Sequence, residues 1–135
     1  MEVMKNSDSI LNSIKKMLGV SPEFDDFDTD IIIHINTVFS ILDQLGVVGP
    51  GDTGYSISDY TSTWNEYLGD KDNLNLIKTY VYLRVRLLFD PPTSTQIKNA
   101  LNEQISEMGY RIFTIYNTPE YTASSTKTKE GTEDG

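Results

Sequence analysis

Hydrophobic residues recur along most of the chain with the spacing of amphipathic helices. In the first such segment, 9–18, five apolar side chains follow an i, i+3, i+4, i+7, i+8 pattern: Ile10, Leu11, Ile14, Met17 and Leu18. A polar residue at 8–9 can cap this segment, and Gly19 can take the left-handed conformation that ends a helix. Lys15 and Lys16 stand near its C-terminus, where the helix dipole favours cations. The pattern predicts a short helix.

A second apolar stripe predicts a longer helix over 29–45. At 100° per residue, its apolar side chains cluster on one side: Ile31, Ile35, Val38, Ile41, Leu42 and Leu45. Ile33 falls in the middle of the opposite, polar face, which predicts a second contact there. His34 lies one turn after Asp30, at a spacing that suits an ion pair or a hydrogen bond. We therefore expect this helix to be buried on more than one side.

Glycines mark the middle of the chain. The segment 46–54 contains four of the nine glycines and one proline, which predicts a loop. It lacks the Gly-Lys-Ser/Thr ending of a phosphate-binding loop and follows a predicted helix instead of a strand. A short helix is expected over 59–68, where apolar side chains share one stripe: Tyr60, Trp64, Tyr67 and Leu68.

The segment 73–89 fits two patterns. Apolar and polar residues alternate from position 80, as in a strand, and a wide apolar face also appears at helical spacing. Helix is favoured, because the run is much longer than a typical strand of about six residues. Thr93 begins a capping box, TSTQ, that introduces the last helix. The segment 111–117, RIFTIYN, either extends that helix or leaves it as a strand.

Composition excludes more functions than it suggests. The chain has 135 residues, a net charge of −9, one histidine and no cysteine, so disulfides, cysteine-bound zinc and a thiol nucleophile are excluded. No apolar run approaches the roughly 20 residues that span a bilayer. The N-terminus lacks the apolar core of a signal peptide, which indicates an intracellular protein. A cationic face for binding phosphate backbones is not expected at this net charge.

No catalytic or metal-binding pattern is visible. Asp26, Asp28 and Asp30 match the start of a calcium loop, but position 6 is Ile31 where glycine is needed, and position 12 is Thr37 where glutamate is needed. We expect an acidic helix start instead, and no metal, no cofactor and no enzymatic activity. Arg84 projects among apolar residues on the helical wheel. It therefore needs an internal partner, an exposed head group, or a carboxylate across a subunit interface.

Two stretches resemble the head–tail connector, or adaptor, proteins of long-tailed bacteriophages. They are IKTYVYLRVRLLFDPPTS at 77–94, and ILNSIKKMLGV followed by an acidic stretch and DIIIHINTVFSILDQLGV within 10–47. The resemblance implies an all-α fold of four to five helices in a bundle-like domain. It also implies a virion neck protein without an active site, assembled in the host bacterial cytoplasm. Its implied partners are other copies of itself in a ring, twelvefold in this family, the portal protein and a stopper or tail-completion protein. The genome DNA would pass through without specific binding, and no membrane is involved.

The resemblance and the charge pattern together give candidate surfaces. We expect a helical domain over 1–117 and a disordered C-terminal tail over 118–135, which can order on the portal. The candidates for subunit contacts or ion pairs are Arg84, Arg86, Asp25, Asp26, Asp28, Asp30 and Ile33. The candidates for portal binding are Arg111, Ile112, Phe113, Ile115 and Tyr116. An alternative function is a small acidic inhibitor that imitates DNA and blocks a host DNA-binding protein, which requires carboxylates spaced along one face.

Overall fold

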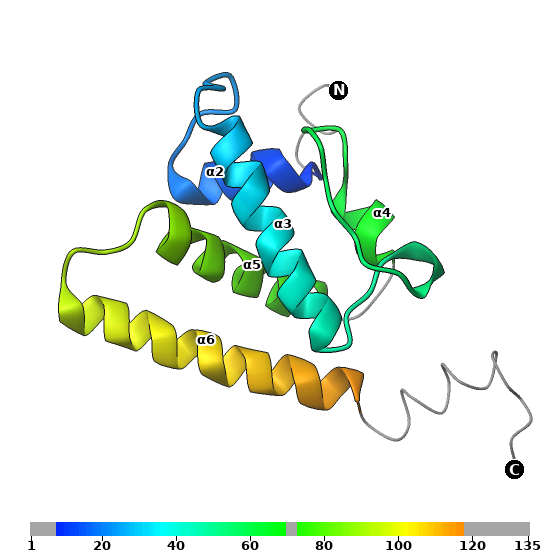
Figure 1. Ribbon diagram of the computed structural model, residues 1–135. Helices are drawn as coiled ribbons and strands as arrows, with labels where there is room; N and C mark the ends of the chain where they lie inside the picture. The colour runs from blue at the N-terminus through cyan, green and yellow to red at the C-terminus, as the bar shows by residue number, and fades with distance from the viewer. Residues whose placement is uncertain (1–7, 70–72, 118–135) are drawn as a thin grey trace, which may run out of the picture.

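The computed structural model describes residues 8–69 and 73–117, and within these ranges the chain is helical without a strand. The elements, labelled as in Figure 1, are α2 (Ile10–Leu18), α3 (Asp28–Gln44), the 3-10 turn η1 (Pro50–Asp52), α4 (Trp64–Leu68), α5 (Leu74–Phe89) and α6 (Thr95–Tyr116). The all-α prediction is confirmed. The predicted tail, 118–135, lies outside the described residues.

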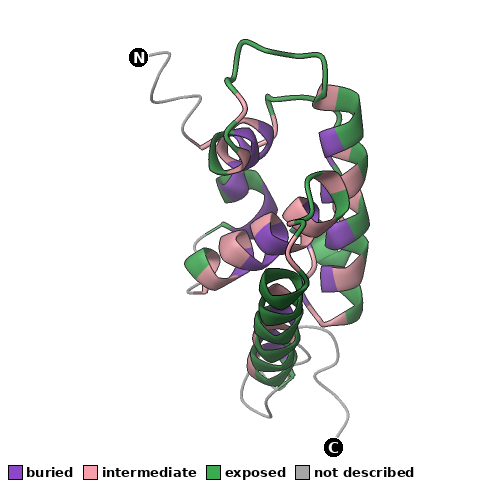
Figure 2. Cartoon of the chain, turned by 90° about the vertical axis from the view of Figure 1, so that its left-hand side faces the viewer, coloured by how far each residue is buried: buried purple, intermediate pink, exposed green. Residues whose placement is uncertain are grey.

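Helix α5 is the centre of the fold. It contacts α2, α3 and α6, and α3 crosses both α2 and α5 (Figure 1). The buried residues line the inner sides of these helices, whereas most of α6 is exposed (Figure 2). Contact on several sides explains why the sequence of α5 carried both apolar patterns. The structure places 73–89 and 111–116 in helices, which decides both ambiguities.

Local signals set several helix ends. Ser9 accepts a hydrogen bond from the backbone N–H of Asn12 at 3.1 Å, and Gly19 has φ +82° at the end of α2. The start of α6 differs from the prediction by one residue, because Ser94, not Thr93, caps the helix and accepts from the N–H of Ile97.

The predicted helix over 59–68 is too long. Only Trp64–Leu68 is helical, because the backbone before it pairs with the start of α2: Ser9 and Thr63 form an isolated antiparallel bridge. The N–H of Ile10 donates to the carbonyl of Ser62 at 3.0 Å. These tertiary hydrogen bonds hold residues 62–63 extended, residues 58–61 form bends and a turn before them, and Tyr60, expected on the apolar stripe, is 54% exposed.

The C-terminal end of α6 is packed against the turn that follows α3. Asn117 donates from its side-chain amide to the carbonyl of Leu45 at 3.1 Å. Gly46 has φ +104°, and a Cβ there would approach Asn117 Nδ2 to 3.1 Å and Tyr116 Cβ to 3.2 Å. A glycine is therefore needed on both grounds, its conformation and the close approach of α6.

Candidate functional surfaces

The acidic segment between α2 and α3 is built around a buried lysine. Lys15 is fully buried, and its Nζ lies 2.7 Å from Asp28 Oδ1. The same ammonium group donates to the carbonyl oxygens of Pro22 at 3.0 Å and Phe24 at 2.8 Å. The expectation that Lys15 interacts favourably with the helix dipole was incomplete, since Lys15 also binds three residues of the acidic segment. Asp28 is correspondingly a structural ion-pair partner.

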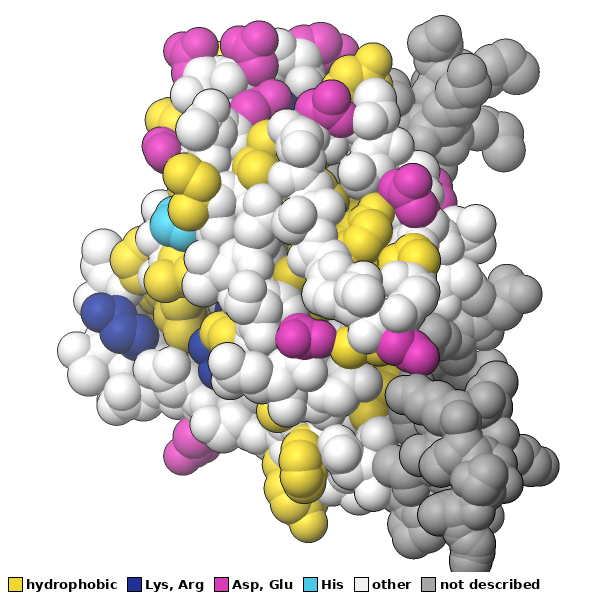
Figure 3. Space-filling model, turned by 45° about the vertical axis from the view of Figure 1, so that its right-hand side comes forward, with side chains coloured by type: hydrophobic (Ala, Val, Ile, Leu, Met, Phe, Trp, Pro, Cys, Tyr) yellow, Lys and Arg dark blue, Asp and Glu magenta, His cyan; other side chains and the backbone are white. Residues whose placement is uncertain are grey.

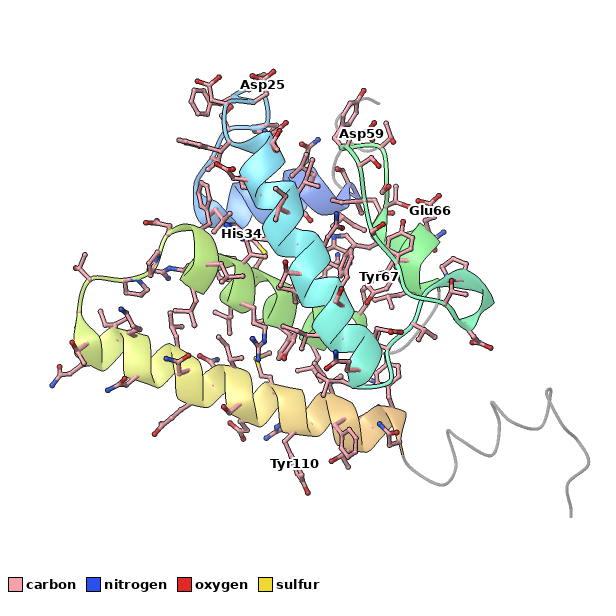
Figure 4. The ribbon with its side chains drawn as sticks, viewed as in Figure 1. Asp25, His34, Asp59, Glu66, Tyr67 and Tyr110 are labelled. Atoms are coloured by element: carbon pink, nitrogen blue, oxygen red, sulfur yellow. The ribbon has the colours of Figure 1, made fainter. Side chains whose placement is uncertain are left out.

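The other carboxylates of this segment face solvent. Within the described ranges, Glu23, Asp25, Asp26 and Asp30 have no lysine or arginine within ion-pair distance. The hydroxyl of Ser21 donates to Glu23, and this hydrogen bond lowers the pKa of the Glu23 carboxyl. Asp25 stands at the tip of the molecule in Figure 4. These four groups are free to meet a partner.

An aromatic cluster connects the acidic segment to the end of α5. The rings of Phe24 and Phe27 lie 5.4 Å apart, and those of Phe27 and Phe89 lie 5.3 Å apart, both edge to face. Phe24 and Phe27 are nevertheless 44% and 42% exposed. The contact with Phe89 means that the acidic segment and the C-terminal end of α5 are neighbours at the same end of the subunit.

Arg84 and Arg86 differ in their surroundings. Arg84 Nε donates to the Tyr80 hydroxyl at 2.8 Å, and its guanidinium lies 5.3 Å from the centre of the Tyr80 ring. No carboxylate of the described ranges is within ion-pair distance of either arginine, so an internal ion pair is not what holds Arg84. Arg86 lines a hollow of about 300 Å³ that is formed with Lys16 and Tyr82 among other residues.

The apolar candidate Ile33 is 56% exposed on α3, so the second contact predicted for it is not made within the subunit. Figure 3 shows hydrophobic side chains on the surface around His34, the cyan residue. His34 forms no hydrogen bond or ion pair with Asp30 in the structure, so that expected pair is absent. Whether Ile33 contacts another subunit stays a prediction.

The five portal-binding candidates separate into core and surface residues. Ile112 is fully buried and Tyr116 is 4% exposed, so both belong to the core of the subunit and their side chains are not on its surface. This corrects their place among the surface candidates. Phe113 is 47% exposed, and Arg111 is exposed and pairs with Glu107 at 3.1 Å. Ile115 is half-buried.

Sequence reasoning missed one exposed aromatic residue on the same helix. Tyr110 is 71% exposed and points away from the rest of the subunit (Figure 4). It precedes Arg111 and lies three residues before Phe113, so Tyr110 and Phe113 share one side of α6. The sequence contained a signal for this exposure, because Tyr110 lies off the apolar stripe on which Ile105 and Ile112 lie.

A second surface that the sequence did not indicate lies between α3 and the loop before α4. It is a hollow of about 340 Å³ lined by Phe39, Ser40, Asp43, Gln44, Gly54, Tyr55 and Ser56. Tyr55 stacks on Tyr67 with the ring centres 4.7 Å apart, and its hydroxyl donates to Glu66 at 2.8 Å. Asp59 and Glu66 lie on the same side of the molecule (Figure 4). This surface therefore carries carboxylates separate from those of the acidic segment.

We expect the folded protein to lose stability at alkaline pH because of Tyr55, which lines this hollow. Burial and the hydrogen bond to Glu66 raise the pKa of Tyr55 to about 12. Because an unfolded tyrosine titrates near pH 10, the unfolded chain loses this proton first, and stability falls as pH rises from about 10 to 12. Urea unfolding across this range should show a smaller loss in Tyr55→Phe than in the unmodified protein. Glu66→Gln should also reduce the loss, and identical profiles would contradict this assignment.

The described residues carry no group of three histidine or acidic side chains that could hold a metal ion. Within residues 8–69 and 73–117 no helix is both long enough and apolar enough to cross a bilayer. The features that stand out are instead exposed apolar and charged side chains, which are typical of surfaces that contact other proteins.

Comparison with known proteins gives one match. The family model described as phage connector protein matches residues 10–119, which include the five α-helices of the described part of the chain. The comparisons with curated proteins and with solved structures gave no match.

Proposed function

Because the chain belongs to the phage connector protein family, we propose that it is the subunit of a ring that docks on the portal and continues the DNA channel toward the tail. The family match over 10–119 is the observation that carries this proposal. A connector is a structural component of the virion, so the chemistry required of the chain is assembly, not catalysis. The proposed partners are further copies of the chain, the portal protein and a stopper or tail-completion protein.

A ring places a geometric demand on each subunit. Contacts between identical subunits close into a ring only when two different surfaces meet head to tail. The subunit offers several exposed surfaces with different chemistry, among them the acidic segment 23–30, the hollow beside Tyr55 and the outer side of α6. We propose twelve copies for the ring, as the resemblance implies, with assembly in the host cytoplasm.

The charge of the chain suits a passage for DNA. A net charge of −9 on each subunit makes the ring strongly negative, and a negative wall repels the phosphate backbone. The genome could then slide through without binding. This proposal differs from the inhibitor hypothesis, which requires phosphate-like spacing of carboxylates on one face. The carboxylates of the described residues are spread over the acidic segment, the side that carries Asp59 and Glu66, the end of α5 at Asp90, and helix α6, and this scatter favours a connector role (Figure 4).

We propose that the outer side of α6 contributes to portal docking. Tyr110 and Phe113 expose aromatic surface, and Arg111 lies beside them. Aromatic and arginine side chains are enriched at the centres of protein interfaces. Residues 118–135 follow directly, so this contact could continue into the C-terminal segment.

Binding of the purified chain to rings of the portal protein from the same phage tests the proposed function. We expect co-sedimentation and a second ring stacked on the portal in negative-stain micrographs. Tyr110→Ala with Phe113→Ala should weaken portal binding by about tenfold or more, because each removes a large aromatic contact. Tyr60→Ala, which removes an exposed aromatic side chain elsewhere, is the matched control. A chain that binds no portal under any condition would contradict the proposed function, whereas an unaffected double variant would contradict only the docking surface.

A further inference from the structure

The two ends of the subunit carry complementary side chains. In Figure 1 the C-terminal end of α5 and the N-terminal end of α6 lie on the left, and α4 with the loop before it lies on the right. The left-hand end carries Arg86 in the last turn of α5 and Lys98 in the first turn of α6. Leu88 and Ile97, beside these cations, are 50% and 52% exposed. We call these four residues the basic end. The basic end also borders one exposed carboxylate, Asp90, which lines a hollow with Arg86 and Lys16, so cations outnumber carboxylates there.

The right-hand side carries carboxylates beside its hollow. Its hollow is walled by the rings of Phe39 and Tyr55 and bordered by Asp43, and Tyr55 in turn holds Glu66. We call this surface the acidic hollow. The nearby cation Lys78 lies over the Trp64 ring at 5.6 Å and forms no ion pair in the described part of the chain. In Figure 3 dark blue cations gather at the left edge, and magenta carboxylates are most frequent across the top and right, with a few also at the left.

We propose that the basic end of one subunit docks on the acidic hollow of the next, and that this contact closes the ring. The inference rests on the proposed function and names the two surfaces that it requires. The occupant of the hollow is a second copy of the chain, because the same subunit supplies the apolar side chains and the cations that complement the hollow. The two surfaces lie on opposite sides of the subunit, which a head-to-tail contact requires.

The geometry also explains why the acidic segment 23–30 is a less suitable partner for the basic end. Phe27 of that segment touches Phe89, next to Leu88, so the segment and the basic end are side by side. A contact between neighbouring patches would bring two subunits together at the same end instead of linking opposite ends.

Charge exchange between the two surfaces tests the inference. One variant, Asp43→Lys with Gln44→Lys, reverses the acidic hollow, and a second, Arg86→Glu with Lys98→Glu, reverses the basic end. Asp43, Gln44 and Lys98 are exposed and Arg86 is half-buried, and none of the four side chains makes an ion pair in the described structure. Each variant alone places like charges opposite one another, so assembly on portal rings should fall about tenfold or more. An equimolar mixture restores opposite charges at every contact, and rings of alternating subunits should form.

The assembly is measured by sedimentation velocity and negative-stain microscopy, and circular dichroism verifies that each variant is folded. The matched control is Asp25→Lys with Asp26→Asn, which changes the net charge by the same +3 as the hollow variant and should assemble normally. The inference is wrong if the single variants assemble, if the mixture fails to recover, or if the control alone prevents assembly. Because the unmodified chain is measured alongside, its own failure to assemble on the portal would contradict the proposed function as well.

Discussion

Replacing Lys15 by methionine should lower the free energy of unfolding by about 3 kcal/mol, although the substitution preserves length and helix propensity. Methionine removes the ammonium group that holds Asp28 and donates to two carbonyl groups of the acidic segment. Those carbonyls lose a charged donor, and the Asp28 carboxylate loses its partner. Because the Asp28 side chain is 29% exposed, water recovers part of the cost, so the lower end of the range for a broken buried ion pair is expected.

Urea unfolding followed by the fluorescence of the single tryptophan measures this effect. Lys16→Met is the matched control, since Lys16 is the next residue along the same helix and is exposed. We expect the control to change stability by no more than about 0.5 kcal/mol. Equal losses of stability in Lys15→Met and Lys16→Met would show that the buried Lys15–Asp28 ion pair contributes no more than any positive charge near the end of this helix.

Trp64→Ala should destabilise the subunit by about 4 kcal/mol. The Trp64 side chain is fully buried, packs against Phe39 and Tyr67, and donates from Nε1 to the Ser13 hydroxyl at 2.8 Å. Alanine would leave a large cavity at the joint between α2 and α4 and an unfilled acceptor at Ser13. Trp64→Phe fills most of the volume and loses only the hydrogen bond and part of the ring, so a loss of about 1–2 kcal/mol is expected.

Thermal unfolding monitored by circular dichroism suits this comparison, because the variants lack the fluorescent reporter. Tyr60→Ala serves as the control, since it truncates an aromatic side chain that is 54% exposed four residues earlier. A ranking in which Trp64→Phe costs as much as Trp64→Ala would mean that the hydrogen bond, not the packed ring, holds the joint together.

The sequence predicted those parts of the fold that depend on local signals. Ser9 caps the start of α2 and Gly19 caps its end, as expected, because capping and left-handed glycine conformations are determined within a few residues. The predicted start of α4 was wrong, because the non-helical backbone at 62–63 depends on hydrogen bonds to residues more than fifty positions away. Likewise, the sequence alone indicates that Lys15 is exposed, as most lysines are. Its burial depends on the acidic segment, which folds over it and supplies its three oxygen partners.

The candidate surfaces were predictable to a smaller extent. Ile33 was recognised because an isoleucine interrupts a polar face, whereas the hollow beside Tyr55 joins α3 to a loop and has no pattern along the chain. Ile112 is an apolar residue that helical spacing alone assigns to either the core or an interface. In the structure Ile112 is buried in the core of the subunit, and its neighbour Phe113 is exposed.

Helix α6 is attached to the rest of the subunit most firmly near its C-terminal end. Of its three buried residues, Ile105 lies at the middle and Ile112 and Tyr116 lie in the second half, and Asn117 anchors that end to Leu45. Residues 95–100 before Leu101 are all exposed, and most of the helix is exposed in Figure 2, so its N-terminal end has the least support from the core. Twenty-two residues form a lever of about 33 Å, and each degree of rotation at the C-terminal end moves the N-terminal tip by roughly 0.6 Å. A tip of this kind can follow a neighbour of slightly different height while the core remains undisturbed.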